Sequence, residues 1–206
     1  MSLIIYGMPA SRAFRNLWAA HELGLAYVNV PYNFTGPEIK DPAYLAINPN
    51  ATIPAIVDDG FPLWESLAIN LYLAKKAGKL WPAGLQGEAQ VMQWTLWAAT
   101  EVEPLIGAWF YHTMFLPPAQ RKPELAADAA ARLPKRLAVL ELVLANRDYL
   151  IGDEFTIADL NVAAVLFRAP KFGLDAFARV KSWHARCCGR DGAKAAIALR
   201  EPTKAA

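Results

Sequence analysis

The segment from Thr52 to Ile69, TIPAIVDDGFPLWESLAI, holds the residues whose types and spacing best suit chemistry. Pro54 opens an alternating apolar run, and a proline cannot donate to a strand ladder, so one side of that strand stays open. Glu65 and Ser66 follow the second apolar run, where a helical period begins. Because the free amides at a helix start bind anions, this broken strand edge suits a short acidic peptide.

The elements around this segment form a small α/β unit. Asp-Gly between two apolar runs predicts a tight hairpin, since glycine accepts positive φ without a Cβ clash. Apolar alternation and helical spacing predict the other elements. They are strands at 3–6 and 26–30, a helix from Phe14 to Gly24, a weak helical signal near residue 44, and a helix over 67–77.

The composition and the secondary-structure pattern of the chain change after residue 78. Residues 79–87, KLWPAGLQG, are typical of a linker, and beyond them we find no strand pattern. Helical patterns follow over 88–115, 126–145, 156 onward, 176–188 and 192–200. The sequence therefore predicts an α/β domain over 1–78, a linker over 79–87 and an all-α domain over 88–206.

Composition excludes several classes of protein. The 206 residues are 55% hydrophobic with a net charge of +2, which argues against nucleic-acid binding. No apolar run reaches membrane-spanning length, and no signal-peptide pattern opens the chain. The two cysteines, Cys187 and Cys188, are adjacent, so neither a disulfide framework nor a metal site is predicted. We expect a reducing, cytoplasmic compartment.

Three segments in this order resemble the cytosolic glutathione transferases: NPNATIPAI, LWESLAI and FTIADL. The hairpin is most similar to that of delta-type and related bacterial members. The resemblance covers nearly the whole chain and implies a thioredoxin-like N-terminal domain with an all-helical C-terminal domain. It also implies glutathione as co-substrate and a homodimer in which each first domain faces the partner's second domain.

The resemblance assigns glutathione contacts to the opening segment. It implies a cis Ile53–Pro54 bond, with the Ile53 backbone pairing with the cysteinyl part of glutathione. Glu65 and Ser66 would hold the γ-glutamyl end through ammonium and carboxylate contacts. The residues alone favour plainer interpretations. Pro54 would be a trans proline that opens a strand, and Ser66 would be a helix N-cap.

Ser11 is the candidate catalytic residue. The segment YGMPASRAFR, residues 6–15, resembles the catalytic turn of serine-type members, and Ser11 falls on their catalytic serine. A hydroxyl that donates to sulfur stabilises a thiolate, which is the reactive form of a thiol. By spacing alone Ser11 is an N-cap. Tyr6, at the end of the first strand, is the rival candidate.

Some positions depart from the family pattern. The histidines expected near the glycine end of glutathione correspond to Ile39 and Ala51, and the arginine that often follows the Glu-Ser pair is Leu67. Lys40 remains as a possible partner for the glycine carboxylate, or as a solvated lysine. These departures predict a weaker grip on glutathione or a different contact with its glycine end.

The helical domain should supply the pocket for the second substrate. The dense aromatic stretch over 109–115 is usually core, but helical spacing cannot turn every member inward. By resemblance the pocket residues are Trp109, His112, Thr113 and Phe115. Thr156 and Asp159 fit a capping box, which is a folding device. We expect His21 on the apolar face of its helix and His184 exposed among basic residues.

The favoured prediction is an enzyme, a glutathione transferase that conjugates the glutathione thiolate to a small apolar electrophile in detoxification. One alternative is glutathione-dependent peroxide reduction at the same site. Another is a non-catalytic binding protein on this fold, which the missing histidines and the basic last part of the chain favour. No metal, nucleic-acid or membrane partner is predicted.

Overall fold

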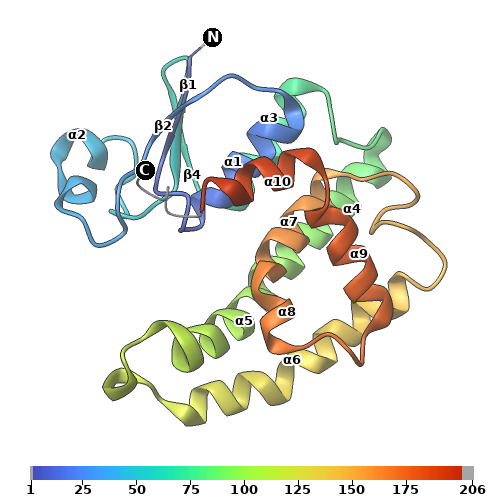
Figure 1. Ribbon diagram of the computed structural model, residues 1–206. Helices are drawn as coiled ribbons and strands as arrows, with labels where there is room; N and C mark the ends of the chain where they lie inside the picture. The colour runs from blue at the N-terminus through green and yellow to red at the C-terminus, as the bar shows by residue number, and fades with distance from the viewer. Residues whose placement is uncertain (1, 201–206) are drawn as a thin grey trace. The chain divides into compact units, whose positions relative to one another are not determined.

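The computed structural model describes residues 2–200, and these residues form two compact units. The first runs from the N-terminus to Trp81 and includes the segment that starts at Gly189. The second spans Pro82–Cys188. Figure 1 follows both along the chain, and each is described by itself below.

A four-stranded mixed sheet forms the centre of the first unit. Its order is β2-β1-β3-β4. β1 pairs with β2 in parallel and with β3 antiparallel, and β3 pairs antiparallel with β4. The strands are β1 Leu3–Tyr6, β2 Val28–Val30, β3 Ala55–Asp58 and β4 Phe61–Trp64. The predicted thioredoxin-like topology is confirmed, with a second strand shorter than the expected 26–30.

The hairpin between β3 and β4 forms where the Asp-Gly pair predicts it. Asp58 pairs with Phe61, so the loop has two residues. Asp59 and Gly60 both have positive φ, at 48° and 87°. Two positive φ values define a type I′ turn, whose twist matches that of the flanking strands. The local sequence therefore sets the register of β4.

Helices cover both faces of the sheet (Figure 1). Helices α1 (Ala13–Leu23) and α3 (Ser66–Ala77) lie on one side, and α2 (Pro42–Leu45) lies on the other. Successive side chains of a strand point to opposite faces of the sheet. The fully buried Ile5 and Ile56 point to the face that α1 covers, and the neighbouring residues point to the face that α2 covers. On the α2 side, the rings of Tyr6, Tyr32 and Tyr44 pack with centroids 5.4–5.6 Å apart.

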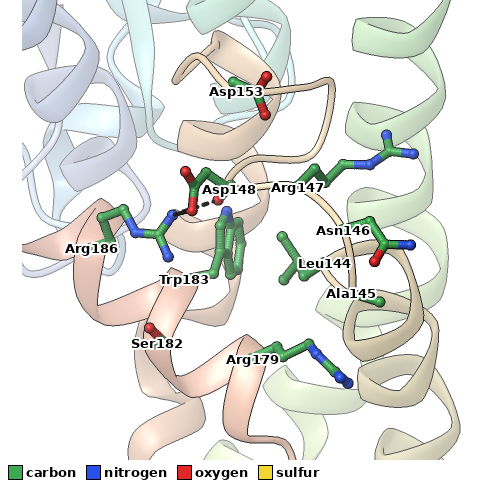
Figure 2. A pocket seen from close by; sticks show the side chains of 10 residues that line it. All are labelled: Leu144, Ala145, Asn146, Arg147, Asp148, Asp153, Arg179, Ser182, Trp183 and Arg186. Carbon is green, nitrogen blue, oxygen red and sulfur yellow. Dashed lines mark hydrogen bonds and ion pairs between the residues drawn. The ribbon is translucent and has the colours of Figure 1, made fainter.

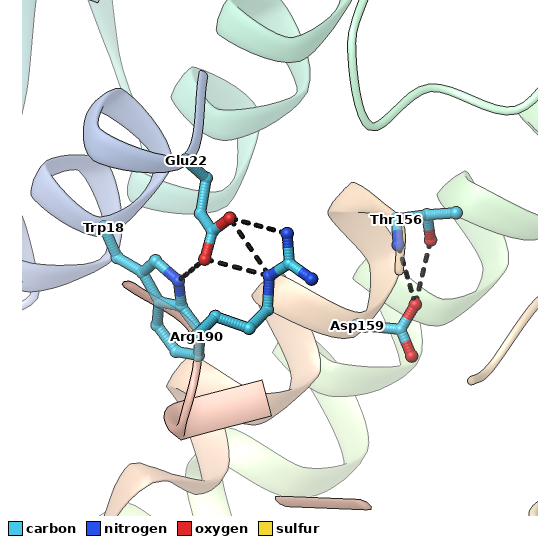
Figure 3. A network of polar contacts seen from close by, with 5 residues as sticks. All are labelled: Trp18, Glu22, Thr156, Asp159 and Arg190. Atoms are coloured by element: carbon cyan, nitrogen blue, oxygen red, sulfur yellow. Dashed lines mark hydrogen bonds and ion pairs between the residues drawn. The ribbon is translucent and has the colours of Figure 1, made fainter. Parts of the chain in front are cut away.

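The last helix, α10 (Asp191–Ala198), packs against α1. Arg190, just before α10, donates from Nε and Nη2 to the Glu22 carboxylate at 2.9–3.0 Å (Figure 3). Trp18 Nε1 donates to the same carboxylate at 3.1 Å. The sequence-based domain boundary placed residues 88–206 together, whereas these contacts join α10 to the α/β unit. The reason is a long-range ion pair that helical periodicity does not reveal.

The second unit is all-helical in its described residues, apart from one isolated bridge between Tyr149 and Gly152. Its first helix begins at Gly84, inside the segment expected to be a linker. The expected helix over 88–115 is divided by a π-helical segment at Ala98–Val102 and ends in another at Tyr111–Phe115. The α-helices are α4 Gly84–Trp97, α5 Glu103–Phe110, α6 Pro123–Val143, α7 Ile157–Val165, α8 Ala169–Phe172 and α9 Ala178–Cys188.

Helix α7 is buried along its whole length and starts with the predicted capping box. Thr156 Oγ1 accepts from Ala158 N, and Asp159 Oδ2 accepts from Thr156 N at 3.0 Å (Figure 3). Asp159 Oδ1 also accepts from Leu150 N at 2.8 Å and from Trp183 Nε1 at 2.9 Å. Burial raises the pKa of Asp159, and these donors oppose the rise. One carboxylate thus joins α7 to the preceding loop and to α9.

Two histidine predictions are wrong. His21 is exposed, and its Nε2 lies 3.0 Å from the hydroxyl of Tyr27. His184 is buried, at 5% exposed, and burial lowers its pKa. Its buried neighbours on α9 are Val180, Trp183 and Cys187. These positions recur at helical spacing, and that period outweighs the basic residues between them.

No helix within residues 2–200 is both long enough and apolar enough to cross a membrane.

We expect Asp159→Asn to lower the free energy of unfolding by about 3 kcal/mol, because an amide NH2 would face backbone or indole donors in a buried site. Chemical denaturation followed by tryptophan fluorescence measures the change. Asp153→Asn, at an exposed position in the same loop region, is the matched control and should stay within about 0.5 kcal/mol of wild type. Equal effects of the two variants would contradict a structural role for the Asp159 carboxylate.

Candidate active site

The register of the sheet brings the three predicted site segments to one edge. Tyr6, the last residue of β1, pairs with Ala55, the first residue of β3, and Ala55 pairs with Trp64, the last residue of β4. The chain therefore leaves β1 toward Ser11, enters β3 through Ile53–Pro54 and leaves β4 into Glu65–Ser66 at the same edge. The first and last of these segments, at Ser11 and Ser66, are 55 residues apart in sequence.

Ser11 lies in a turn that is fixed by backbone hydrogen bonds. Gly7 N donates to Val30 O and Met8 N to Tyr32 O, which extends the pairing of β1 with β2. Half-buried Ser11 donates its hydroxyl proton to Met8 O at 2.7 Å and accepts from Ala13 N at 3.1 Å. Ser11 N also donates to Met8 O, so that carbonyl keeps a partner if the hydroxyl proton turns elsewhere. The N-capping contact and a free rotation of the hydroxyl are thus compatible.

Gly7 allows the close approach of the turn to its neighbours. Its φ is +130°, which side chains rarely adopt. A Cβ there would stand 2.8 Å from Ala13 Cβ and 3.2 Å from Ile53 Cβ. Gly7 therefore lets the end of β1, the start of α1 and the Ile53–Pro54 segment touch.

The peptide bond between Ile53 and Pro54 is cis, as the resemblance implies. The segment before it is held through the carbonyl of Thr52, which accepts from the Tyr44 hydroxyl at 2.6 Å and from Asn48 Nδ2 at 2.7 Å. Ile53 itself is 9% exposed and packs in the cluster that also holds Tyr44. The strand edge at Ile53 is therefore rigidly supported from the α2 side.

Glu65 and Ser66 differ sharply in environment. Glu65 is exposed and has φ 73°, a strained conformation for a residue with a side chain, and such strain tends to gather at ligand sites. Ser66 is 4% exposed, and its Oγ accepts from Arg15 Nη1 at 3.1 Å. A buried guanidinium beside the first turn of α3 makes this helix start a strong place for a carboxylate.

Asn16 ties α1 to the start of α3. Its Nδ2 donates to Ser66 O and to Asn70 Oδ1, both at 2.8 Å. Its Oδ1 is buried and has no hydrogen-bond partner among the described residues. The backbone of Ser66 is thus fixed by Asn16, while its hydroxyl is held by the preceding residue, Arg15.

The glycine end of the expected ligand has weaker support. Ile39 is 5% exposed and packs in the same apolar cluster as Ile53. Lys40 ends the 3-10 segment Pro37–Lys40 and is exposed. The packing of Ile39 therefore keeps the Lys40 backbone next to the Ile53 segment. Ala51 has φ 52°, so the residue at the second departing position is part of a tight turn.

Tyr6 is placed away from the helix starts. Its ring packs with Tyr32 and Tyr44 on the α2 side of the sheet, and burial together with Tyr32 raises its pKa. Alternation along β1 turns Ile5, rather than Tyr6, toward the α1 side. The structure therefore brings Ser11 close to the start of α1 and gives Tyr6 a packing role.

The predicted pocket residues lie within the helical unit. Trp109 packs edge-on against Phe172 at 5.4 Å, and its carbonyl accepts from Thr113 Oγ1 at 2.6 Å. His112 Nδ1 accepts from Lys122 N at 3.3 Å. Phe115 is 47% exposed and packs edge-on with Tyr111. A π-helical turn carries three of the four predicted residues, and such turns are frequent at functional sites.

One cavity of about 360 Å³ lies in the helical unit (Figure 2). Its lining is largely polar, and none of the predicted site residues belongs to it. The lining residues are Leu144, Ala145, Asn146, Arg147, Asp148, Asp153, Arg179, Ser182, Trp183 and Arg186. Within residues 2–200, no three His, Cys, Asp or Glu side chains gather in a way that could hold a metal ion.

Comparison with known proteins agrees with this geometry. Residues 1–75 match the family model for the glutathione S-transferase N-terminal domain, and residues 102–191 match the model for its C-terminal domain. The chain is 32% identical to glutathione S-transferase 1 of Schizosaccharomyces pombe, over 88% of this chain and 89% of that protein. The chain belongs to the glutathione S-transferase family.

Other relatives fit the same assignment. Glutathione S-transferase 3 of Zea mays is 35% identical over 88% of this chain and 86% of that protein. Among solved structures, a theta class glutathione S-transferase from Xanthomonas axonopodis pv. citri, with glutathione bound, superposes with a TM-score of 0.88. It shares 27% identity and covers 95% of this chain and 96% of that one. The predicted family and fold class are confirmed.

The roles of Arg15 and Asn16 at the candidate glutathione site were not predicted from the sequence. Neither residue lies on the apolar stripe that helical spacing predicts, and both are buried because almost the whole of α1 is buried. Their partner, Ser66, lies fifty residues away, and only the packed structure identifies it.

We expect Gly7→Ala to destabilise the protein by more than Gly24→Ala, because both require positive φ but only Gly7 also meets a close contact. Left-handed backbone alone costs about 1–2 kcal/mol. Thermal denaturation measures both variants. Gly24→Ala should keep glutathione affinity, whereas Gly7→Ala should weaken it, and equal affinity in the two would contradict the close-approach role of Gly7.

Proposed function

We propose that the site edge binds glutathione and that the enzyme transfers its thiolate to a small apolar electrophile. The observation that carries this proposal is the meeting of Ser11, cis Pro54 and Ser66 at one sheet edge. The starts of α1 and α3 also reach that edge; α3 offers its first amides to an anion, and α1 adds the positive end of its dipole. A tripeptide with a thiolate between two carboxylate ends matches this distribution of donors.

Each part of glutathione has a partner in this proposal. The Ile53 backbone pairs with the cysteinyl residue as an added strand. Glu65 accepts from the α-ammonium, and the Ser66 hydroxyl with the first amides of α3 holds the α-carboxylate. Arg15, bonded to Ser66 Oγ, supplies positive charge at that carboxylate. Lys40 attracts the glycine carboxylate. Because Lys40 is exposed, this ion pair contributes less binding free energy than the buried Arg15 does at the other end of the ligand.

Ser11 performs the catalytic step by stabilising the thiolate. A free thiol has a pKa of about 8.5, so only a small fraction is ionised at neutral pH. The Ser11 hydroxyl turns its proton from Met8 O to the sulfur, and Met8 O keeps the Ser11 N–H as donor. The first amides of α1 add favourable charge. The thiolate then attacks the electrophile and forms the C–S bond. Either a leaving group departs with the bonding electron pair, or the thiolate adds to a polarised double bond and the resulting carbanion takes a proton from water.

The second substrate is an apolar electrophile, as expected of a detoxifying transferase. Trp109, His112, Thr113 and Phe115 are the proposed contacts, supported by their aromatic surroundings and by the exposure of Phe115. We propose the cytoplasm as the compartment.

We also propose a homodimer, supported by large exposed apolar residues. Leu85 and Leu96 on α4 are 84% and 62% exposed, and Phe61 on the edge strand β4 is 50% exposed. Exposed apolar surface on an edge strand and on a helix is available for burial against a second copy, as the family resemblance implies. Sedimentation at micromolar concentration should give twice the 22.6 kDa chain mass. Leu96→Glu should shift it toward the monomer, while Leu142→Glu, 77% exposed on α6, should not. A wild-type monomer would contradict the dimer.

The test of the function is the ionisation of bound glutathione. We expect Ser11→Ala to raise the pKa of the bound thiol by about one to two pH units, because a hydrogen bond to a charged group is worth about 1.5–3 kcal/mol. Turnover at neutral pH should fall about 10- to 100-fold. The ultraviolet absorbance of the thiolate, titrated against pH, measures the first effect, and a conjugation assay measures the second.

Exposed Ser182→Ala is the control and should match wild type in both measurements. Two failures are separable. If calorimetry with the wild-type protein finds no glutathione binding at millimolar concentration, the proposed function is wrong. If the wild type binds and conjugates but Ser11→Ala titrates like it, only the role of Ser11 is wrong.

A further inference from the structure

We propose that Arg200, just beyond α10, is a positioning residue for the catalytic turn, so that the last helix braces the residue that stabilises the thiolate. This inference rests on the proposed function of Ser11. Arg200 Nη1 donates to Pro9 O at 3.0 Å and lies 3.5 Å from Ser11 O. The guanidinium carbon lies 4.8 Å from the centre of the Phe14 ring. One side chain therefore holds the turn before, at and after Ser11.

The brace is anchored at its other end. Arg190 forms a two-pronged ion pair with Glu22, whose side chain is 5% exposed, and Trp18 donates to the same carboxylate (Figure 3). A Cβ on Gly192 would come within 2.7 Å of Glu22 Cγ, so α10 approaches α1 as closely as glycine permits. The first turn of α10 is therefore fixed against the last turn of α1.

The two anchors define an antiparallel pair of helices. Arg190 contacts the C-terminal end of α1 at Glu22, and Arg200 contacts its N-terminal end at Pro9 and Phe14. The eight residues of α10 span about 12 Å, the same helical rise as from Phe14 to Glu22 along α1. The two arginines thus hold opposite ends of α1, and only Arg200 contacts the catalytic turn.

Arg200 can affect the thiolate in two ways. Its hydrogen bonds fix the carbonyls of Pro9 and Ser11, and hence the direction of the Ser11 side chain and of the first amides of α1. Its charge, near the same turn, also favours a bound anion. A displacement of about 1 Å in a catalytic group can cost about 10²-fold in rate, so the brace has a measurable effect on chemistry.

The experiment compares Arg200→Ala with Arg190→Ala, which frees the same helix at the end far from Ser11. We expect Arg200→Ala to lower kcat about tenfold and to raise the pKa of bound glutathione, with KM for glutathione changed less than about twofold. Arg190→Ala should lower the melting temperature at least as much as Arg200→Ala does, yet leave the pKa of bound glutathione at its wild-type value within error. Arg200→Lys, which keeps the charge and one donor, should recover part of the lost kcat.

A second readout needs no glutathione. Hydrogen exchange at the amides of residues 11–14 should accelerate in Arg200→Ala and stay at the wild-type rate in Arg190→Ala. If exchange there is unchanged in Arg200→Ala, or if both variants shift kcat and thiol pKa equally, α10 is only a stabilising helix and the inference is overturned. If the wild-type protein binds no glutathione, the proposed function fails, while the exchange result still decides whether Arg200 braces the turn.

Discussion

The candidate site depends on one constraint, the pairing of Tyr6 with Ala55 and of Ala55 with Trp64. This row of three residues sets where the chain leaves β1, enters β3 and leaves β4. A slip of one residue at either pairing would turn side chains to the opposite face and separate Ser11 from Ser66. The type I′ turn at Asp59–Gly60 fixes one pairing, and the buried alternation of Ile5 and Ile56 fixes the other.

Around that row the protein accepts polar burial that a simple core would avoid. Arg15, Asn16, Ser66 and Asn70 are all buried where α1 meets α3, and the Asn16 carbonyl oxygen has no hydrogen-bond partner among the described residues. Buried polar groups cost free energy unless they are paired, so apolar packing would stabilise this helix contact better. The arrangement is understandable at a site that must hold an anionic ligand in a fixed position.

Features whose cause is local were predictable from the sequence. The hairpin follows from Asp59–Gly60, because only a few residue types accept positive φ. The start of α7 follows from Thr156 and Asp159, which cap three residues apart. The catalytic turn and the Glu65–Ser66 pair at the start of α3 were located by resemblance, and their roles in binding and catalysis are proposals. The start of α4 at Gly84, inside the expected linker, was missed because helix ends depend on weak local signals.

Local patterns along the chain predicted most strands and helices and an α/β part followed by a helical part, and three short motifs pointed to the family to which the chain belongs. Tertiary structure alone decided the roles of residues whose partners are far along the chain. It turned Tyr6 into the tyrosine cluster, joined Arg15 to Ser66, buried His184 and placed α10 on α1. The physical reason is that spacing along the chain reports only which side of an element a residue occupies. Which group the residue contacts on that side depends on how distant segments pack.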